Sequence, residues 1–141
     1  MFSKACEYAL RTMIYLNSMK ADNQRVGLND IAAAIDSPVS FTAKILQQLV
    51  RAQLLLSVRG PHGGFVVVDR KISLHEIVVA IDGPSLFKNC VVGLSECSET
   101  KPCPLHHKFV DIRKSLTDEL KNTVLDELNE DVLQGMSYLK V

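Results

Sequence analysis

Hydrophobic positions recur at helical spacing through the first third of the chain. Between Lys4 and Met19 apolar side chains lie mostly three or four positions apart, which predicts an amphipathic helix. The Ala-rich run Leu28–Asp36 predicts a second, short helix that ends before Pro38. From Phe41 to Leu54 apolar residues fall on one side and polar or cationic residues on the other, which predicts a third helix with Ser40 as its N-cap.

The pattern then changes to one typical of strands. Two runs rich in leucine and β-branched residues, Leu54–Val58 and Phe65–Val68, surround the glycine-rich segment Arg59–Gly64. Together they predict a two-stranded hairpin whose glycines permit the turn. Helix, turn, helix and hairpin follow one another in the order of a winged helix-turn-helix.

A fourth helix is predicted where Ser73 and Glu76 have the spacing of a capping box, and Gly83 ends it. Residues 85–103 show no periodicity, and a long helix is predicted to begin at Pro104. Its apolar stripe suits either the core of the chain or the seam of a dimer. The stripe consists of Leu105, Phe109, Ile112, Leu116 and Leu120, and a short final helix is marked by Val124, Leu125 and Leu128.

Composition adds limits to this picture. A chain of 141 residues with 47% hydrophobic and 23% charged residues has the character of a single folded domain. The formal net charge of zero excludes a uniformly basic nucleic-acid binder, but the acid-free stretch Ser37–Val68 contains three cations, Lys44, Arg51 and Arg59. Charged residues interrupt the N-terminal apolar positions, so we expect a cytoplasmic protein with no signal peptide and no membrane segment.

The third helix and the hairpin loop carry the residue types of a DNA-reading surface. Polar side chains on a recognition helix contact base edges in the major groove, and a basic loop beside it can follow the backbone into the minor groove. Glycines at Gly60, Gly63 and Gly64 are expected to let backbone N–H groups approach phosphates. The alternatives are a solvated surface hairpin and, less favoured, a nucleotide-binding loop. The candidate DNA-binding residues are Ser40, Phe41, Thr42, Lys44, Gln48 and Arg51 in the helix and Arg59, Pro61, His62 and Gly63 in the loop.

Three of the four cysteines lie in the irregular segment and suggest a metal site. Cys90, Cys97, Cys103 and His106 follow the pattern C-x6-C-x5-C-x2-H, and thiolates are soft ligands for zinc or iron–sulfur clusters. The pattern lacks the C-x2-C pairs of common structural zinc sites. Zinc, a cluster or redox thiol, and buried unreactive thiols are the three interpretations that the spacing leaves open. Cys6 is interpreted as a small apolar residue of the first helix.

Several segments of the chain resemble a known family. The stretches "YALRTMIYL", "SVRGPHGGF" and "SLHEIVVAIDGP", together with the three cysteines, are similar to the Rrf2 family of winged-helix transcription regulators, which includes IscR, NsrR and CymR. The resemblance implies a homodimer that binds an imperfect palindrome in promoter DNA, with the long helix near the C-terminus as the dimer seam. This chain has Ala43 where IscR-like members carry Glu, His62 where glycine is frequent, and a first cysteine gap one residue longer.

The resemblance also implies a cofactor. In the cluster-bearing branch three cysteines hold an iron–sulfur cluster, and they match Cys90, Cys97 and Cys103. His106 matches the histidine of the IscR-like members, which favours a [2Fe–2S] cluster. Glu7 of the partner subunit is the alternative fourth ligand, because NsrR-like members place an acidic residue just before "YALR"; a [4Fe–4S] cluster goes with that alternative.

These observations predict a fold that is mostly α with a small β-hairpin. We expect a winged helix-turn-helix DNA-binding domain at residues 1–83, a cysteine-bearing cluster loop at 84–103, and a dimerisation helix with a C-terminal tail at 104–141. The expected function is that of a homodimeric regulator, not an enzyme, which senses redox state, nitric oxide or iron–sulfur supply. A zinc- or thiol-dependent regulatory or interaction protein without a cluster is the alternative, and a Cys–His hydrolase or transferase comes third.

Overall fold

Seven α-helices and one two-stranded hairpin make up the structure, a computed structural model that describes residues 1–141. The expected fold class, mostly helical with a small hairpin, is confirmed. In chain order the elements are α1 (Lys4–Ser18), the 3₁₀ turn η1 (Lys20–Asp22), α2 (Leu28–Ile35), α3 (Val39–Arg51), β1 (Leu55–Val58), β2 (Gly64–Val67), α4 (Leu74–Asp82), α5 (Ser85–Lys88), α6 (His106–Asn122) and α7 (Leu125–Leu133).

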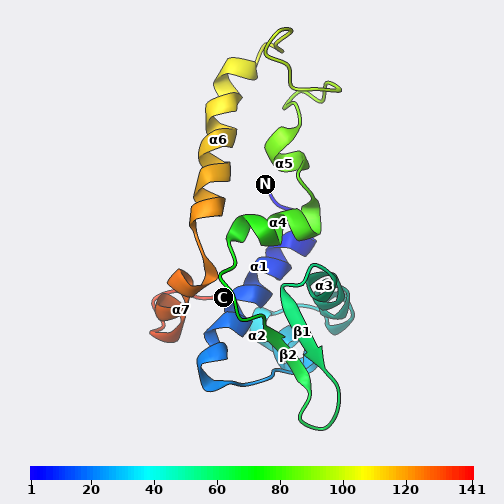
Figure 1. The fold of residues 1–141 in the computed structure, drawn as a ribbon, viewed down its shortest axis with the longest axis vertical. Helices are drawn as coiled ribbons and strands as arrows, with labels where there is room; N and C mark the ends of the chain where they lie inside the picture. The colour runs from blue at the N-terminus through cyan, green and yellow to red at the C-terminus, as the bar shows by residue number, and fades with distance from the viewer.

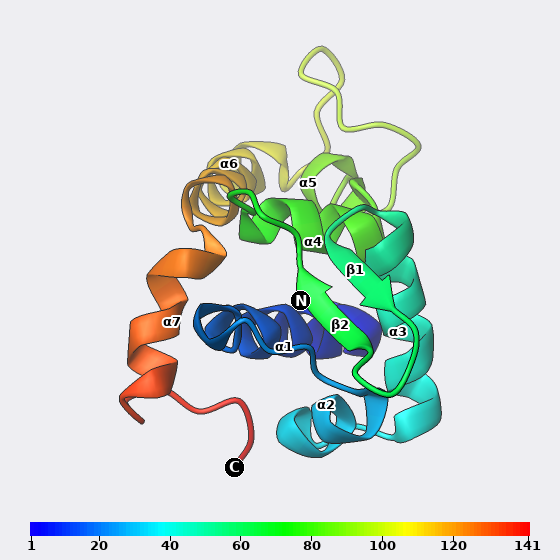
Figure 2. The same ribbon diagram turned by 60° about the horizontal axis from the view of Figure 1, so that its bottom comes forward.

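Helix α1 lies at the centre of the head, which is the part of the molecule formed by α1–α4, the hairpin and α7 (Figure 2). Its Ala9, Met13 and Leu16 are at most 2% exposed. Burial of one large apolar side chain stabilises a fold by roughly 1.5–3 kcal/mol. The same core contains Val26, Ile31, Ile35, Ile45, Leu46, Leu49, Leu54, Leu55, Val67, Ile72, Ile77 and Leu125.

The turn between α2 and α3 is formed by Asp36 in the left-handed conformation, with φ of 53°, and by the residues up to Pro38. Helix α3 begins at Val39 with Pro38 as its N-cap, so the prediction that Ser40 is the N-cap is wrong. The ring of Pro38 holds φ near −57°, which allows the helix to begin at the next residue. Ser40 is therefore an exposed residue of the first helical turn.

The hairpin pairs in antiparallel register, with Leu55 opposite Val67. A third segment joins it, because Val26 and Phe65 exchange two backbone hydrogen bonds of 3.1 and 2.9 Å. Gly64 permits this approach: its φ is +141°, and a Cβ there would lie 2.7 Å from the Val26 carbonyl oxygen. The hairpin is thus held against the segment that precedes α2.

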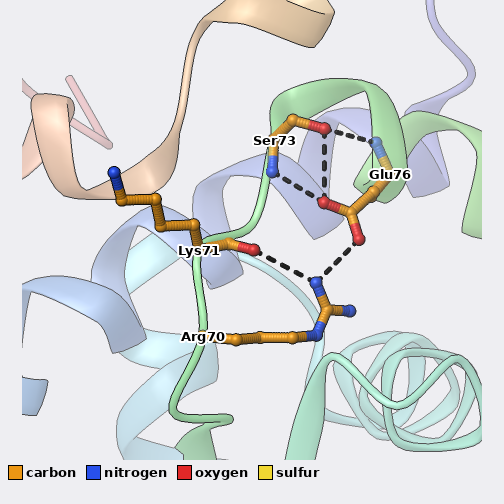
Figure 3. Close-up of polar contacts among 4 residues, drawn as sticks. All are labelled: Arg70, Lys71, Ser73 and Glu76. Carbon is orange, nitrogen blue, oxygen red and sulfur yellow. Dashed lines mark hydrogen bonds and ion pairs between the residues drawn. The ribbon is translucent and has the colours of Figure 1, made fainter.

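A polar network stabilises the start of α4 (Figure 3). The Ser73 hydroxyl accepts a hydrogen bond from the Glu76 N–H at 3.3 Å, and the Glu76 carboxylate accepts one from the Ser73 N–H at 2.9 Å, which confirms the predicted capping box. Arg70 Nη1 donates to the same carboxylate at 2.8 Å and to the Lys71 carbonyl at 3.1 Å. Burial opposes ionisation, but the Ser73 N–H and the Arg70 guanidinium outweigh it and lower the pKa of the Glu76 carboxyl.

A short antiparallel contact joins the segment before α4 to the end of α6. The Leu74 N–H donates to the Thr123 carbonyl and the Leu125 N–H donates to the Ile72 carbonyl, each at 3.0 Å. Ile72 and Leu125 are both buried in the core of the head. The final helix α7, which the sequence placed with the dimerisation segment, therefore packs on the head; the expected division at residues 83 and 103 stays a prediction.

Helices α5 and α6 and the segment between them extend away from the head (Figure 1). We call residues 89–105 the cysteine loop; it lies at the opposite end of the long axis from the hairpin loop. Helix α6 begins at His106 with Leu105 as its N-cap, so the prediction that Pro104 is the first helical residue is wrong. The reason is local: the His106 N–H donates to the Cys103 carbonyl at 3.0 Å, which closes a turn that contains the proline.

The capping network gives a first prediction. Replacing Ser73 with Ala removes the side-chain cap, so we expect the free energy of unfolding to fall by about 1 kcal/mol in urea titrations. Ser40→Ala is the matched control, because Ser40 makes no cap hydrogen bond, and its stability should match that of the parent. If both variants lost the same amount of unfolding free energy, the assignment of Ser73 as a side-chain cap and of Ser40 as a residue without a cap hydrogen bond would be contradicted.

The lowered pKa of Glu76 sets the pH dependence of the same network. A carboxyl whose pKa is lowered by folding contributes stability above its unfolded pKa, and this contribution disappears as the pH falls through the folded value. Glu76→Gln should therefore be less stable than the parent near neutral pH, and the difference should shrink in acid. If Glu76→Gln were less stable than the parent by the same amount at every pH, the stabilising role of the Glu76 charge would be contradicted.

Candidate functional site

The outer face of α3 carries the predicted recognition residues. Ser40, Lys44, Gln48 and Arg51 are all exposed, and their spacing of four, four and three positions places them on one side of the helix. On the opposite side, the apolar residues of α3 are buried in the core. The predicted division of this helix into an apolar and a polar, cationic face is confirmed. Gln47 is also exposed on α3 and was not among the predicted residues.

Two predicted recognition residues point inward instead. Thr42 is 0% exposed, and its hydroxyl lies 2.9 Å from both the Ser37 hydroxyl and the Pro38 carbonyl. Phe41 is half-buried and packs edge-to-face on Tyr8, with ring centroids 5.6 Å apart. Because Thr42 bonds back to the residue four positions earlier, its side chain stabilises the turn and is not available at the outer face.

Helix α1 fixes the position of the helix-turn-helix through Arg11. The Arg11 guanidinium lies 4.4 Å from the centroid of the Tyr8 ring, and its Nη1 donates to the Ile35 carbonyl at 2.9 Å. Ile35 is the last residue of α2, so the bond satisfies a carbonyl at the helix end. The segment "YALR" therefore links α1 to both helices of the motif.

The hairpin loop, residues 59–63, exposes Arg59, Pro61 and His62. The Gly63 N–H donates to the Gly60 carbonyl at 2.9 Å, so this N–H is already bonded and not free to approach a phosphate as we expected. A Cβ on Gly63 would lie 2.2 Å from the carbonyl oxygen of Val58, which leaves no room for a side chain. Glycine at position 63 is therefore required by the turn itself.

A polar groove of about 720 Å³ separates the hairpin loop from the residues before α2. Arg25 and His62 are exposed residues that line this groove, and Asp30 is the one acid among the lining residues. Arg25 was not among the predicted residues, because a single cation in an irregular segment has no periodic signal. The Val26–Phe65 hydrogen bonds bring it beside the loop.

Two of the four predicted metal ligands, Cys97 and His106, are in contact where the cysteine loop meets α6. Cys97 Sγ lies 3.4 Å from His106 Nδ1, and Arg113 Nη2 donates to the same sulfur at 2.9 Å. The backbone N–H of Leu94, that of Val92 and the Cys103 thiol together lower the pKa of the Cys90 thiol. Nowhere do three or more His, Cys, Asp or Glu side chains lie close enough together to hold a metal ion.

Glu7, the alternative ligand, lies in the first turn of α1. Its carboxylate forms an ion pair of 2.7 Å with Lys4, and the Lys4 ammonium lowers the pKa of the Glu7 carboxyl. The neighbouring Cys6 is 0% exposed, and burial together with the Asp82 carboxylate raises the pKa of its thiol to about 12. The interpretation of Cys6 as a small core residue is confirmed.

A helix-turn-helix followed by a hairpin, with a polar face on the second helix, defines a winged-helix protein. Residues 2–131 match the Rrf2 family, described as iron-dependent transcriptional regulators. The chain belongs to the Rrf2 family, as the resemblance implied, and its relatives are named as transcriptional regulators rather than enzymes. No helix has both the length and the apolar character needed to span a membrane.

Individual relatives agree with this assignment. An HTH-type transcriptional regulator of Aquifex aeolicus (strain VF5) is 30% identical over 131 residues, which cover 90% of each chain. IscR of Vibrio vulnificus (strain YJ016) is 29% identical over 126 residues, 88% of this chain and 74% of the relative. Among solved structures, CymR, the global cysteine regulator of B. subtilis, has the same fold with a TM-score of 0.77 at 23% identity, covering 92% of this chain and 96% of CymR.

Proposed function

We propose that the protein is a homodimeric regulator that binds an imperfect palindrome in promoter DNA and responds to redox state, nitric oxide or iron–sulfur supply through an iron–sulfur cluster. The observation that carries the proposal is the layout of α6. This helix begins at the cysteine loop, beside Cys97, and ends at backbone hydrogen bonds with the head. A regulator of transcription acts where the DNA is, so we place it in the cytoplasm.

In this proposal the exposed face of α3 enters the major groove, where Lys44, Gln48 and Arg51 contact base edges and phosphates. The hairpin loop follows the neighbouring minor groove with Arg59 and His62. Arg25, across the polar groove from the loop, contacts the phosphate backbone beside it. Ser40 and Pro61 are exposed at the same surface, and Gly63 shapes the loop.

The proposed dimer seam lies along α6. Of its apolar stripe only Leu120 is buried within the chain; Phe109 and Leu116 are half-buried, and Ile112 is 58% exposed. A second copy packed on this stripe by a two-fold axis would cover it. Two heads related by that axis would meet two half-sites, which is why the operator is expected to be palindromic.

The donor chemistry of the cysteine loop fits an iron–sulfur cluster. Cys90, Cys97, Cys103 and His106 would hold it, with Glu7 of the partner subunit as the alternative fourth ligand. Hydrogen-bond donors lie beside two of these sulfurs: backbone N–H groups lower the pKa of the Cys90 thiol, and Arg113 Nη2 donates to Cys97 Sγ at 2.9 Å. Thiolates are the forms that bind a cluster. When bound, a cluster supplies a centre that reacts with oxidants and nitric oxide.

A thiol- or zinc-dependent regulator without a cluster is the second candidate. It is favoured because no three of the predicted ligands lie close enough together to hold a metal ion. Iron and sulfide analysis of anaerobically purified protein separates the candidates. Brown protein with bands in the visible region supports the cluster, whereas colourless protein with stoichiometric zinc contradicts it.

The wing assignment predicts the effect of Arg59→Ala. Loss of a good base contact weakens specific binding by roughly 1–3 kcal/mol. The measurement is a titration, at one salt concentration, of an operator selected from genomic fragments. Lys108→Ala is the control, because it removes a positive charge from an exposed position in the first turn of α6. This end of α6 lies at the opposite end of the molecule from the hairpin loop (Figure 1). Binding of Arg59→Ala as tight as that of the parent would contradict the assignment.

The sensing proposal predicts that loaded and metal-free protein bind one operator with different affinities. The change in the free energy of operator binding must equal the difference between the free energies with which the cluster binds the two arrangements of the dimer. Both forms are titrated against the same selected operators. Equal affinity on every genuine operator would remove sensing and leave the cluster with a structural role.

The choice of fourth ligand predicts different spectra for two variants. With His106 as ligand, His106→Ala should change the visible spectrum and shorten the lifetime of the reconstituted cluster, and Glu7→Ala should leave both unchanged. The visible spectrum of each variant, followed over time in air, provides the comparison. The reverse pattern would assign Glu7 of the partner subunit and favour the [4Fe–4S] form.

A further inference from the structure

Arg113, in the middle of α6, makes contacts that the sequence does not indicate. Its Nη2 donates to Cys97 Sγ at 2.9 Å, and its Nη1 donates to the carbonyl oxygen of Asn89, the residue before Cys90. One guanidinium therefore contacts the cysteine loop at two points. These are the carbonyl of Asn89, which precedes the first predicted ligand, and the sulfur of the second predicted ligand, Cys97.

The position of Arg113 on the helix explains how it reaches this loop. Seven residues, or about two turns, separate it from His106, so both lie on the same face of α6. Side chains on a helix lean toward its N-terminus, which brings the guanidinium back toward His106 and Cys97. A cavity of about 330 Å³ lies against this face, lined by His106, Val110, Arg113 and Cys97 among others.

The charge of Arg113 has no carboxylate partner. The ion pairs of the molecule join Lys4 to Glu7, Lys20 to Asp69 and Arg70 to Glu76, and Arg113 is in none of them. Its hydrogen bonds to protein atoms go to a sulfur and a carbonyl of the cysteine loop. Bonds from a charged donor are stronger than neutral ones, and two nitrogen donors in a fixed plane hold two acceptors at once.

We propose that Arg113 is a positioning residue for the cysteine loop. In the metal-free protein Arg113 holds Asn89 and Cys97 on α6, and in the loaded protein it keeps a positive charge beside the ligand sulfurs. The second part, the role in the loaded protein, rests on the proposed cluster. The first part, the role in the metal-free protein, does not. A lysine at this position keeps the charge but has one nitrogen, so it cannot hold both acceptors in the same way.

The metal-free protein tests the first part by amide hydrogen exchange. The Gly93 N–H donates to the Cys90 carbonyl at 3.0 Å, and the Asn89 N–H donates to the Ser85 carbonyl at 2.9 Å, so these two amides report on the part of the loop that Arg113 contacts. Loss of a charged hydrogen bond should make them exchange roughly tenfold faster in both Arg113→Ala and Arg113→Lys.

The controls separate a local effect from general loosening. Lys108→Ala removes a charge from the same helix and should leave exchange unchanged, and the buried amides of α3 should be unaffected in every variant. Unchanged exchange at Asn89 and Gly93 in Arg113→Ala overturns the positioning role. Equal acceleration in α3 overturns it as well, because the residue would then act on overall stability.

Reconstitution with ferrous iron and sulfide under anaerobic conditions tests the second part. A positive charge and a hydrogen bond near ligand sulfurs stabilise the reduced cluster. Arg113→Ala should therefore show a lower midpoint potential than the parent, with Arg113→Lys between them. Lys121→Ala, in the last turn of α6 and away from the cysteine loop, should equal the parent. Equal potentials in parent and Arg113→Ala overturn this part. A parent that takes up no iron and sulfide contradicts the proposed function instead, and the exchange result on metal-free protein still decides the role of Arg113.

Discussion

The burial of α1 on several sides is the constraint on which the rest of the structure depends. Helices α2, α3, α4 and α7 and strand β2 all pack against it, and its Ala9 and Met13 are fully buried (Figure 2). Truncation of a large side chain at such a position typically costs about 2–5 kcal/mol, because the surroundings relax only in part. This one packing arrangement sets the directions in which α3 and the hairpin present their polar residues. It also sets the place where α7, and hence α6, attaches.

The second constraint is the backbone contact between Ile72–Leu74 and Thr123–Leu125. Residues 68–71 connect Ile72–Leu74 to β2 and the hairpin loop, and Thr123–Leu125 follows directly after α6. Ile72 and Leu125 anchor it in the core, so the contact cannot slide without exposing apolar surface. A reorientation of α6 must therefore either bend the helix, break these hydrogen bonds or move the segment that leads to the hairpin. This is the physical basis for the proposed coupling between the cysteine loop and the proposed DNA-binding surface.

The sequence predicts the elements of the head well and their ends less well. Helical periodicity and the capping box at Ser73 are local signals, and the structure confirms both. The ends at Ser40 and Pro104 were misplaced because several neighbouring residues can cap a helix, and only the backbone geometry selects one. The inward position of Thr42 depends on a hydrogen bond to Pro38, and the positions of Arg25 and Arg113 depend on contacts far along the chain. No local pattern contains that information.

The separation of the predicted ligands indicates which part of the molecule has to move for the proposed metal centre to form. His106 and Arg113 are held by the hydrogen bonds of a 17-residue helix, whereas the three cysteines lie in a loop that includes Gly93 at φ of +78°. Distortion of the helix would break several backbone hydrogen bonds, while a change in the loop mainly rotates single-residue dihedrals. We therefore expect the cysteines to move toward α6 rather than the reverse. Because Arg113 already bonds to Cys97 and Asn89, the contacts that would change on loading of the proposed cluster are contacts with α6, the same helix that ends at the head.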